Sequence, residues 1–402
     1  FTSELSRAMR DQSFEQTETV TLLNENFICV LVDLHEQPGL AAWYQGWLRS
    51  DLQLRGWPLN IWLTPELKPF DGANYLPPSD EWGNIGFLSK LKQVLTGWTS
   101  DPEGMRRKAD RSLERFFSEH DIGPPAPLDA SIVSEVVGDF SAEWMSDFDA
   151  VNGGFGLPPL HPRPELLRSF LLSADPGERE AALQSLRSMA TMGLRDPLDG
   201  GFFRYASDSE WRVPYMQKTL SDQARMALAY LDAALLTEEA LYSGVAAQTL
   251  GFALGLGEPG KGFVAALDST LDSVLSGYLW SYQDIKRTLG REQTDLFCEV
   301  FAASEEGNLP ADAYLNVDST GLNLPRGFDE SGDLDGSLRA LLEARGSRST
   351  PLRDSSAGSG TLGLLLSAFS RGGNELERDD LTAAAESLAG FIRQELVLSS
   401  GL

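Results

Sequence analysis

The sequence predicts an α/β domain followed by a longer, mostly helical domain. Three observations lead to this prediction. Residues 1–100 alternate short apolar runs of strand length with amphipathic segments of helical period. Residues 123–127 read Gly-Pro-Pro-Ala-Pro, a composition typical of a stiff spacer between domains. Beyond this spacer, apolar residues recur at helical spacing almost to the end of the chain.

The elements of the first domain follow from their apolar period and their end signals. In chain order we expect a helix over 14–25, a buried strand over 27–32, a helix over 40–53, strands over 57–63 and 70–76, and a helix over 86–98. A further helix starts at Asp101-Pro102-Glu103, because Asp caps free N–H groups and Pro fits the first turn. Residues 1–120 are therefore the predicted first domain and 121–128 the predicted linker.

The second predicted domain, residues 129–402, consists of helices joined by loops. Candidate helices cover 130–147, 164–173, 178–192, 219–236, 238–255, 282–301, 333–344, 360–370 and 379–397. A glycine-aromatic element recurs between some of them, at residues 153–156, 200–203 and 262–263. Glycine permits tight turns there, and an aromatic side chain can cover the helical core. Repeated helix pairs of this kind suggest an α/α toroid or solenoid.

The charge of the chain excludes several kinds of partner. The 33 basic and 59 acidic residues give a net charge of -26. So acidic a chain repels phosphate backbones and anionic lipids, and we expect it to bind neither nucleic acid nor membranes. No apolar run approaches the ~18 residues that a membrane span needs. We expect a cytoplasmic protein.

Cysteine and histidine usage argues against a metal or redox centre. The two cysteines, Cys29 and Cys298, lie far apart, and Cys29 belongs to the apolar run 28–32, where a buried structural cysteine is expected. No CxxC motif is present. The three histidines, His35, His120 and His161, are scattered. We therefore expect no metal and no cofactor.

Several motifs resemble a bacterial and animal family that joins a thioredoxin-like domain to a six-hairpin, glycosidase-like α/α toroid. The matching segments span nearly the whole chain and include residues 13–15, 22–27, 56–60, 63–70, 75–78, 153–156, 162–164, 204–205, 213–214, 222–224, 266–268 and 305–308. The resemblance implies a thioredoxin-like first domain and a toroid as the second. Compared with the family, the chain is expected to lack the first thioredoxin strand and to be incomplete at its C-terminus.

The thioredoxin active site departs from the family pattern. The family's Cys-His-Trp-Cys-His motif falls on residues 3–7, so that Ser3 and Ser6 replace both cysteines. Thiol–disulfide exchange needs a thiolate nucleophile and a sulfur leaving group, and serine supplies neither. Pro58 matches the cis proline beside the dithiol of thioredoxin-like folds. We therefore expect a cis Trp57–Pro58 bond in a domain that is not a thiol–disulfide oxidoreductase.

The toroid also lacks residues that its relatives carry. Phe203 and Tyr215 stand in place of histidines, and Gln217 in place of a glutamate. All three replacements remove acid–base groups, and Tyr215 and Gln217 keep hydrogen-bonding capacity. The candidate ligand-binding residues, expected to converge on one concave surface, are Arg204, Tyr205, Tyr215, Gln217, Lys218, Asp222 and Asp268. The competing interpretation of Arg204, Lys218 and Asp222 is an internal ion-pair network at helix ends, which is the commoner arrangement.

The function that we predict is a redox-inactive binding or scaffold protein. Its ligand would be a sugar or a small polar molecule in the toroid, and a protein partner is a further possibility. The alternative is a carbohydrate-active enzyme, either a glycoside hydrolase or similar to a sugar epimerase, that uses toroid carboxylates. The acids in or near motif loops that could serve it are Asp196, Asp199, Asp208, Asp222, Asp268 and Asp272. Each of them is more commonly a solvated or capping side chain.

Overall fold

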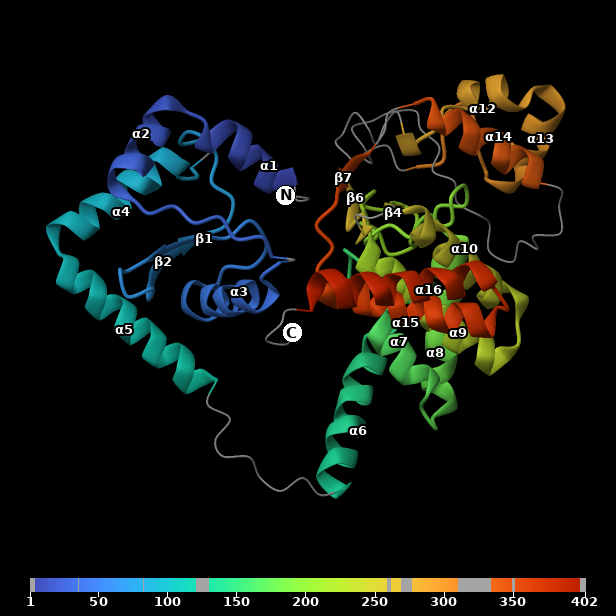
Figure 1. Cartoon of the computed structure of the whole chain (residues 1–402), viewed down its shortest axis with the longest axis horizontal. Coiled ribbons are helices and arrows are strands. Elements are labelled where there is room, and N and C mark those ends of the chain that lie inside the picture. The colour runs from blue at the N-terminus through green and yellow to red at the C-terminus, as the bar shows by residue number, and fades with distance from the viewer. Residues whose placement is uncertain are drawn as a thin grey trace. The chain divides into compact units, whose positions relative to one another are not determined.

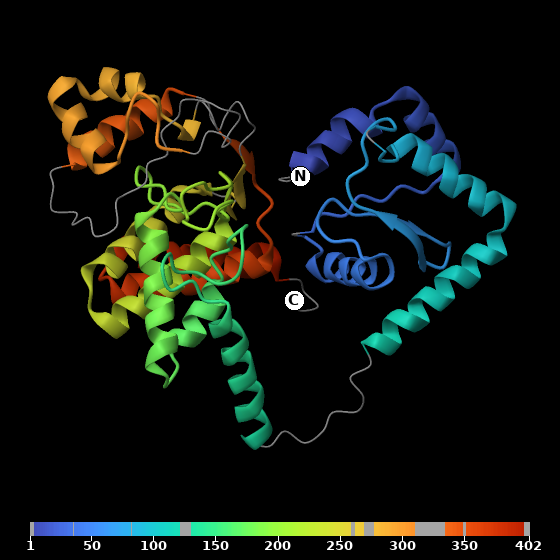
Figure 2. The same ribbon diagram turned by 180° about the vertical axis from the view of Figure 1, so that it is seen from behind.

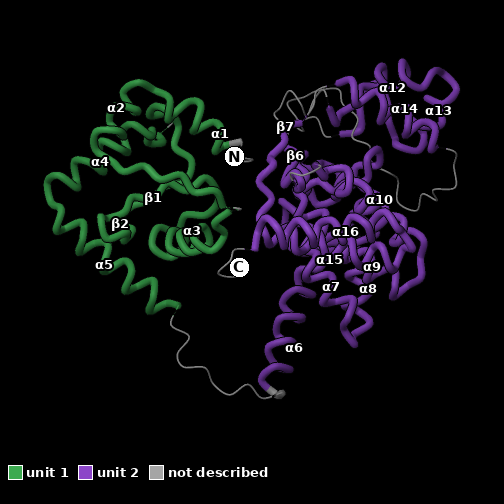
Figure 3. The backbone as a smooth tube through the Cα atoms, viewed as in Figure 1, with its two compact units in different colours: residues 1–127 green, residues 128–402 purple. Residues whose placement is uncertain are grey.

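The chain divides into two compact units, Phe1–Pro127 and Leu128–Leu402 (Figure 3). This computed structural model describes residues 4–34, 36–81, 83–120, 130–258, 262–268, 277–309, 334–348 and 351–397 (Figures 1 and 2). The boundary between the units falls within the predicted linker, residues 121–128, which lies outside the described residues.

Unit 1 is an α/β arrangement of five helices, one π-helical turn and one hairpin within its described residues. Its elements are α1 Glu4–Ala8, the π-helical turn Met9–Phe14, α2 Thr17–Asn26, α3 Pro38–Leu52, β1 Asn60–Leu63, β2 Pro69–Ala73, α4 Phe87–Ser100 and α5 Pro102–Glu119. β1 and β2 pair antiparallel, from Asn60 opposite Ala73 to Leu63 opposite Pro69. Trp62 and Phe70 of the hairpin pack with Phe87 and Leu91 of α4 in one core. The hairpin and the four longer helices were predicted.

The predicted strand over 27–32 is wrong. These residues have no regular secondary structure, and Ile28 is 96% exposed and Leu31 72% exposed. Cys29 is also exposed, against the expectation of a buried cysteine. A strand needs a neighbour to bond its N–H and C=O groups, and the described sheet of unit 1 contains β1 and β2 alone. An apolar, β-branched run cannot become a strand without that neighbour.

Two local predictions in unit 1 are confirmed. The Trp57–Pro58 peptide bond is cis. Asp101 caps α5, with its carboxylate accepting a hydrogen bond from the backbone N–H of Gly104 at 2.8 Å. The cap is a local signal, because it depends on a few neighbouring residues. The cis bond was expected from the resemblance to thioredoxin-like folds, since a proline by itself only makes the cis form accessible.

Unit 2 is built mainly of helices. They are α6 Ala130–Ser146, α7 Pro164–Leu171, α8 Pro176–Thr191, α9 Leu220–Thr237, α10 Ala240–Gly255, α12 Tyr282–Leu289, α13 Arg291–Val300, α14 Asp335–Gly346, α15 Ser359–Glu375 and α16 Asp379–Phe391, which a π-helical turn, Ile392–Leu396, extends. The single helix predicted over 282–301 is in fact two. It breaks at Gly290, whose φ of 73° and ψ of 176° leave the helical region.

The helices of unit 2 pair as α/α hairpins around two cores. In sequence order α7 packs on α8, α9 on α10, and α15 on α16, while α9 also contacts α7 and α15 (Figure 1). One apolar core runs through these six helices and includes Leu186, Tyr230 and Phe369. A second core belongs to α12, α13 and α14. An α/β unit followed by a unit built mainly of paired helices agrees with the predicted fold class, except that unit 2 also contains short strands.

A small sheet in unit 2 brings together loops that are distant in sequence. Its strands, none of them predicted, are β3 Lys218–Thr219, β6 Ala266–Asp268 and β7 Leu352–Asp354, in the order β3-β6-β7. A separate pair joins β4 Gly257–Glu258 to β5 Gly262–Phe263. The first sheet places residue 268 beside the segment that leads into α9, and this is where several candidate site residues lie.

Candidate functional site

Three extended segments align beside the start of α9. Leu160 and Ala206 exchange two backbone hydrogen bonds, of 2.8 and 2.9 Å. The N–H of Tyr215 donates to the C=O of Tyr205 at 2.8 Å, and Ala206 also pairs with Pro214. The segments around residues 160, 205 and 215 therefore lie side by side, although each comes from a different loop.

A chain of polar side chains crosses these segments. Arg204 donates a hydrogen bond through Nη1 to Oε1 of Gln217. The Nε2 of Gln217 donates in turn to Oδ1 of Asp268 at 3.3 Å. Gln217 is 1% exposed and Asp268 3% exposed, whereas Arg204 is half-buried. The structure thus brings three of the predicted residues into one hydrogen-bonded chain, with its arginine nearest to solvent.

Two tyrosines stack beside this chain. The rings of Tyr205 and Tyr215 have centroids 4.9 Å apart and are inclined by 2°. The ring of His161 lies 5.1 Å from that of Tyr205. Both tyrosines are half-buried, and His161 is partly exposed. We call the set of His161, Arg204, Tyr205, Tyr215, Gln217, Asp222 and Asp268 the tyrosine site.

Asp222 and His161 have shifted pKa values at the tyrosine site. Burial raises the pKa of Asp222, although the hydroxyl of Thr219 and the charge of Arg204 oppose this shift. Partial burial lowers the pKa of His161, and the charges of Arg163 and Arg204 lower it further. The site therefore holds a carboxyl that keeps its proton to a higher pH than usual and an imidazole that stays neutral to a lower one.

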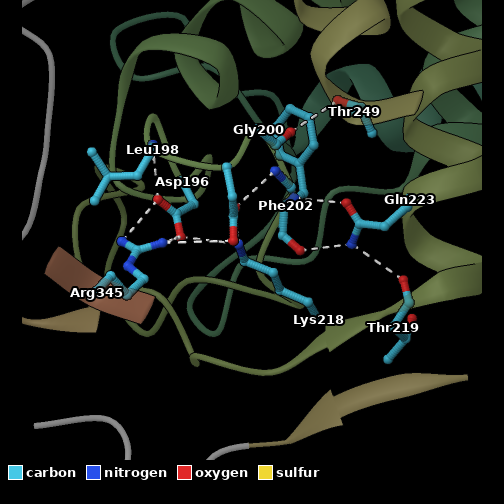
Figure 4. Close-up of polar contacts among 11 residues, drawn as sticks. Asp196, Leu198, Gly200, Phe202, Lys218, Thr219, Gln223, Thr249 and Arg345 are labelled. Atoms are coloured by element: carbon cyan, nitrogen blue, oxygen red, sulfur yellow. Dashed lines mark hydrogen bonds and ion pairs between the residues drawn. The ribbon is translucent and has the colours of Figure 1, made fainter. Parts of the chain in front are cut away.

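Lys218 lies in a second network, which we call the buried ion network. Its ammonium contacts Asp196 at 2.9 Å and also pairs with Asp199 (Figure 4). Lys218 Nζ also lies 4.9 Å from the ring centroid of Phe203, which shares a cavity wall with Met216. Side chains alternate along an extended segment, so Met216 and Lys218 point to one side and Gln217 to the other. Lys218 accordingly fits the internal ion-pair interpretation rather than the ligand site.

The buried ion network ties α14 to the loop before α9. Arg345 of α14 binds Asp196 with two hydrogen bonds, of 2.6 and 3.2 Å. Burial opposes ionisation, yet Arg345 and Lys218 hold the pKa of Asp196 well below its ordinary value. Burial and the charge of Asp196 raise the pKa of Asp199. Two acids and two bases therefore share one buried region and link three segments of unit 2 that are distant in sequence.

The loop that carries Asp196 and Asp199 is held by its backbone. Gly200 has a φ of +84°, and a Cβ there would lie 2.8 Å from Gln248, so that glycine is required. The side chain of Gln223 receives a hydrogen bond from the N–H of Phe202 at 2.7 Å and donates to its C=O at 2.8 Å (Figure 4). This second glycine-aromatic element therefore fixes the position of Arg204, two residues later.

Two cavities adjoin the buried ion network. One, of about 560 Å³, lies between the loop 197–200, α10 and α14, and the other, of about 20 Å³, lies against Phe203, Met216 and Tyr278. Arg204, Gln217 and Asp268 line neither of them. The concave surface expected around the ligand candidates therefore stays a prediction.

The remaining candidates lie apart or outside the described residues. Ser3 and Asp272 are outside them, Ser6 is a half-buried residue within α1, and Pro58 is half-buried before β1. Asp208 receives a hydrogen bond from the backbone N–H of Glu210 at 2.6 Å, which is a turn-capping role. Sequence reasoning missed His161 and Arg163. Their signal was the Pro162-Arg163-Pro164 motif, but its proximity to Arg204 depends on the tertiary fold.

Within the described ranges, no group of three or more His, Cys, Asp or Glu side chains could hold a metal ion. None of the helices in the described part of the chain combines the length and the apolar character needed to cross a membrane.

Two kinds of known sequence are similar to the chain. The family model Thioredox_DsbH, described as a protein of unknown function, DUF255, matches residues 2–116. Spermatogenesis-associated protein 20 of Rattus norvegicus is 28% identical over 443 residues, covering 98% of this chain and 55% of that one. The Homo sapiens protein of the same name is 28% identical over 432 residues, covering 96% and 54%. The chain thus spans about half the length of these relatives.

Solved structures give a looser likeness. A sugar epimerase from a ruminal bacterium overlaps 67% of this chain and 88% of its own, with 11% identity and a TM-score of 0.31. Cellobiose 2-epimerase from Spirochaeta thermophila overlaps 69% and 89%, with 16% identity and a TM-score of 0.29. Overlaps at these scores are too loose to assign an activity. The chain is thus similar to the Thioredox_DsbH family model over residues 2–116 and, over nearly its own whole length, to about half of spermatogenesis-associated protein 20.

Proposed function

We propose that unit 2 binds a small polyhydroxy ligand, such as a sugar, at the tyrosine site. The observation that carries this proposal is the stacked pair Tyr205–Tyr215 beside the hydrogen-bonded chain of Arg204, Gln217 and Asp268. A sugar offers an apolar ring face to aromatic side chains and hydroxyl groups to polar ones. Few polar groups in fixed positions beside apolar surface are typical of small-molecule sites.

The fixed positions of the polar groups support binding. Gln217 is buried and uses both ends of its amide, accepting from Arg204 and donating to Asp268. Its orientation is therefore set, and so is that of the Arg204 guanidinium, which retains further N–H donors. Pre-oriented donors lose little side-chain entropy when a ligand binds.

The test is a panel of mono- and oligosaccharides in a thermal-shift assay, followed by ligand-observed NMR with each hit. Tyr215→Leu should weaken a hit about tenfold, because an aromatic contact contributes about 1 kcal/mol or more. Tyr282→Leu is the matched control, since Tyr282 is a half-buried tyrosine of α12 outside the site. The proposal fails when no sugar binds, or when both variants weaken binding equally.

A second candidate is a carbohydrate-active enzyme that uses Asp222 and Asp268. The observation in its favour is the raised pKa of Asp222, which burial causes and which suits a general acid. Glycoside hydrolysis needs such an acid together with a second carboxylate. The same NMR samples, followed over a day, distinguish the candidates. New sugar signals that disappear in Asp222→Asn would establish catalysis, whereas unchanged sugars would leave binding alone.

A further inference from the structure

Among the described residues, neither Arg163 nor Arg204 forms an ion pair with a carboxylate, although the charge of Arg204 acts on the nearby Asp222. Arg163 precedes α7, and its guanidinium lies 4.5 Å from the ring centroid of Trp144. Its Nε is buried and, within the described part of the chain, has no hydrogen-bond partner. Arg204 binds the neutral amide of Gln217. Desolvating a guanidinium without a balancing charge is unfavourable, so each position needs an explanation.

The rest of unit 2 shows how readily arginines are paired in this chain. Acidic residues outnumber basic ones, 59 to 33. Arg168 pairs with Asp232 at 2.6 Å, Arg371 pairs with the same carboxylate at 2.7 Å, and Arg345 pairs with Asp196. Not every half-buried arginine is paired, since Arg179 donates to the backbone C=O of Ser173. Arg163 and Arg204 differ from Arg179 in lying near the same histidine, His161.

Both arginines lie close enough to His161 for their charges to act on it. The backbone pairing of Leu160 with Ala206 aligns the segment before Arg163 with the segment that contains Arg204. Partial burial lowers the pKa of His161, and the positive charges of both arginines lower it further. The neighbouring acid, Asp222, has a pKa that burial raises, which reduces the negative charge available locally.

The backbone at Arg163 adds a second observation. Its φ of 52° and ψ of 51° lie in the left-handed region, which is unfavourable for a residue with a side chain. Such a conformation persists where the surrounding structure fixes it, here between Pro162 and Pro164. In this conformation the guanidinium of Arg163 lies over the ring of Trp144.

We propose that Arg163 and Arg204 bind an oxyanion, a carboxylate or a phosphate group, on the ligand of the tyrosine site. This inference rests on the proposed function and names the chemical class of the ligand, an acidic or phosphorylated sugar. The planar guanidinium matches both oxyanions through paired N–H donors. The stacked tyrosines receive the sugar ring, and the arginines receive its charged group.

The experiment compares glucose, glucuronate and glucose 6-phosphate at one ionic strength, with Kd measured by titration calorimetry. At least one charged sugar should bind about tenfold or more tightly than glucose. Whichever of the two is favoured identifies the oxyanion as carboxylate or phosphate. Equal affinity for all three sugars would overturn the inference while leaving the proposed function intact.

Arg163→Met tests the assignment, because methionine can keep the apolar contact with Trp144 but removes the charge. The preference for the charged sugar should fall below about threefold, with glucose affinity unchanged. Arg187→Met is the matched control, since Arg187 also lies over a ring, that of Tyr242, but is paired with Glu239. A preference that survives Arg163→Met, or that Arg187→Met reduces equally, would overturn the assignment.

If Arg163→Met does not fold, a competition experiment on the unaltered protein tests the same inference. Inorganic phosphate should compete with the charged sugar and leave glucose binding unaffected. If no sugar binds but phosphate still gives a titration that Arg163→Met abolishes, the anion site stands and the sugar proposal fails. If neither phosphate nor any sugar binds, both are overturned.

Discussion

Lys218 provides the sharpest test of the energetics of unit 2. Its side chain is fully buried, and its partners Asp196 and Asp199 are 2% and 24% exposed. Lys218→Met removes the ammonium and leaves two carboxylates facing Arg345 alone. Breaking a buried pair on one side costs about 3–5 kcal/mol. We expect about 3 kcal/mol at pH 7, because Asp199 can take up a proton and relieve part of the cost.

Urea unfolding followed by circular dichroism measures this loss, and thermal unfolding should shift by roughly 6 °C or more. Lys92→Met is the control, because Lys92 and its partner Glu18 are 53% and 64% exposed. An exposed pair of this kind contributes under about 1 kcal/mol. Adding Asp199→Asn to Lys218→Met should recover part of the stability. A loss no larger than that of Lys92→Met, or a double variant less stable than the single one, would refute the reasoning.

Two further predictions concern a tyrosine and the thioredoxin-like unit. Burial raises the pKa of Tyr242 to about 12, while an unfolded tyrosine ionises near ~10. The unfolded state therefore loses its proton first, and stability should fall between about pH 10 and 12 by at most ~3 kcal/mol. Tyr242→Phe should reduce this loss of unfolding free energy with rising pH. An unchanged pH dependence in the variant would contradict the attribution of the loss to Tyr242. In an insulin-reduction assay the protein should show no turnover above background, because serine replaces both dithiol cysteines; measurable turnover would contradict this.

The sequence alone determined the order and nature of most elements. Helices with a regular apolar period and clear end signals, such as α5 after Asp101-Pro102, lie within a few residues of their predicted limits. The hairpin β1–β2 was also predictable from its apolar pattern, whereas the cis Trp57–Pro58 bond was predicted from the resemblance to thioredoxin-like folds. Apolar periods and helix caps depend on neighbouring residues, and a local sequence therefore predicts them.

The tertiary structure decided which side chains meet. The chain Arg204–Gln217–Asp268 was predicted as part of one group, and the structure brings these residues together. The same prediction placed Lys218 with them, whereas it pairs with Asp196 and Asp199. A shift of one residue along an extended segment reverses the direction of a side chain, so adjacent residues can belong to different networks.

Two features show most clearly what could not be predicted from the sequence. They are the structure of residues 27–32 and the set of residues around His161. The apolar composition of residues 27–32 indicated a buried strand, but Ile28 and Val30 are exposed because burial requires a surface supplied by another part of the chain. His161 and Arg163 reach Arg204 through the pairing of Leu160 with Ala206, a contact between residues 46 positions apart. Contacts over such separations arise from packing of the whole unit, and no local pattern of residue types encodes them.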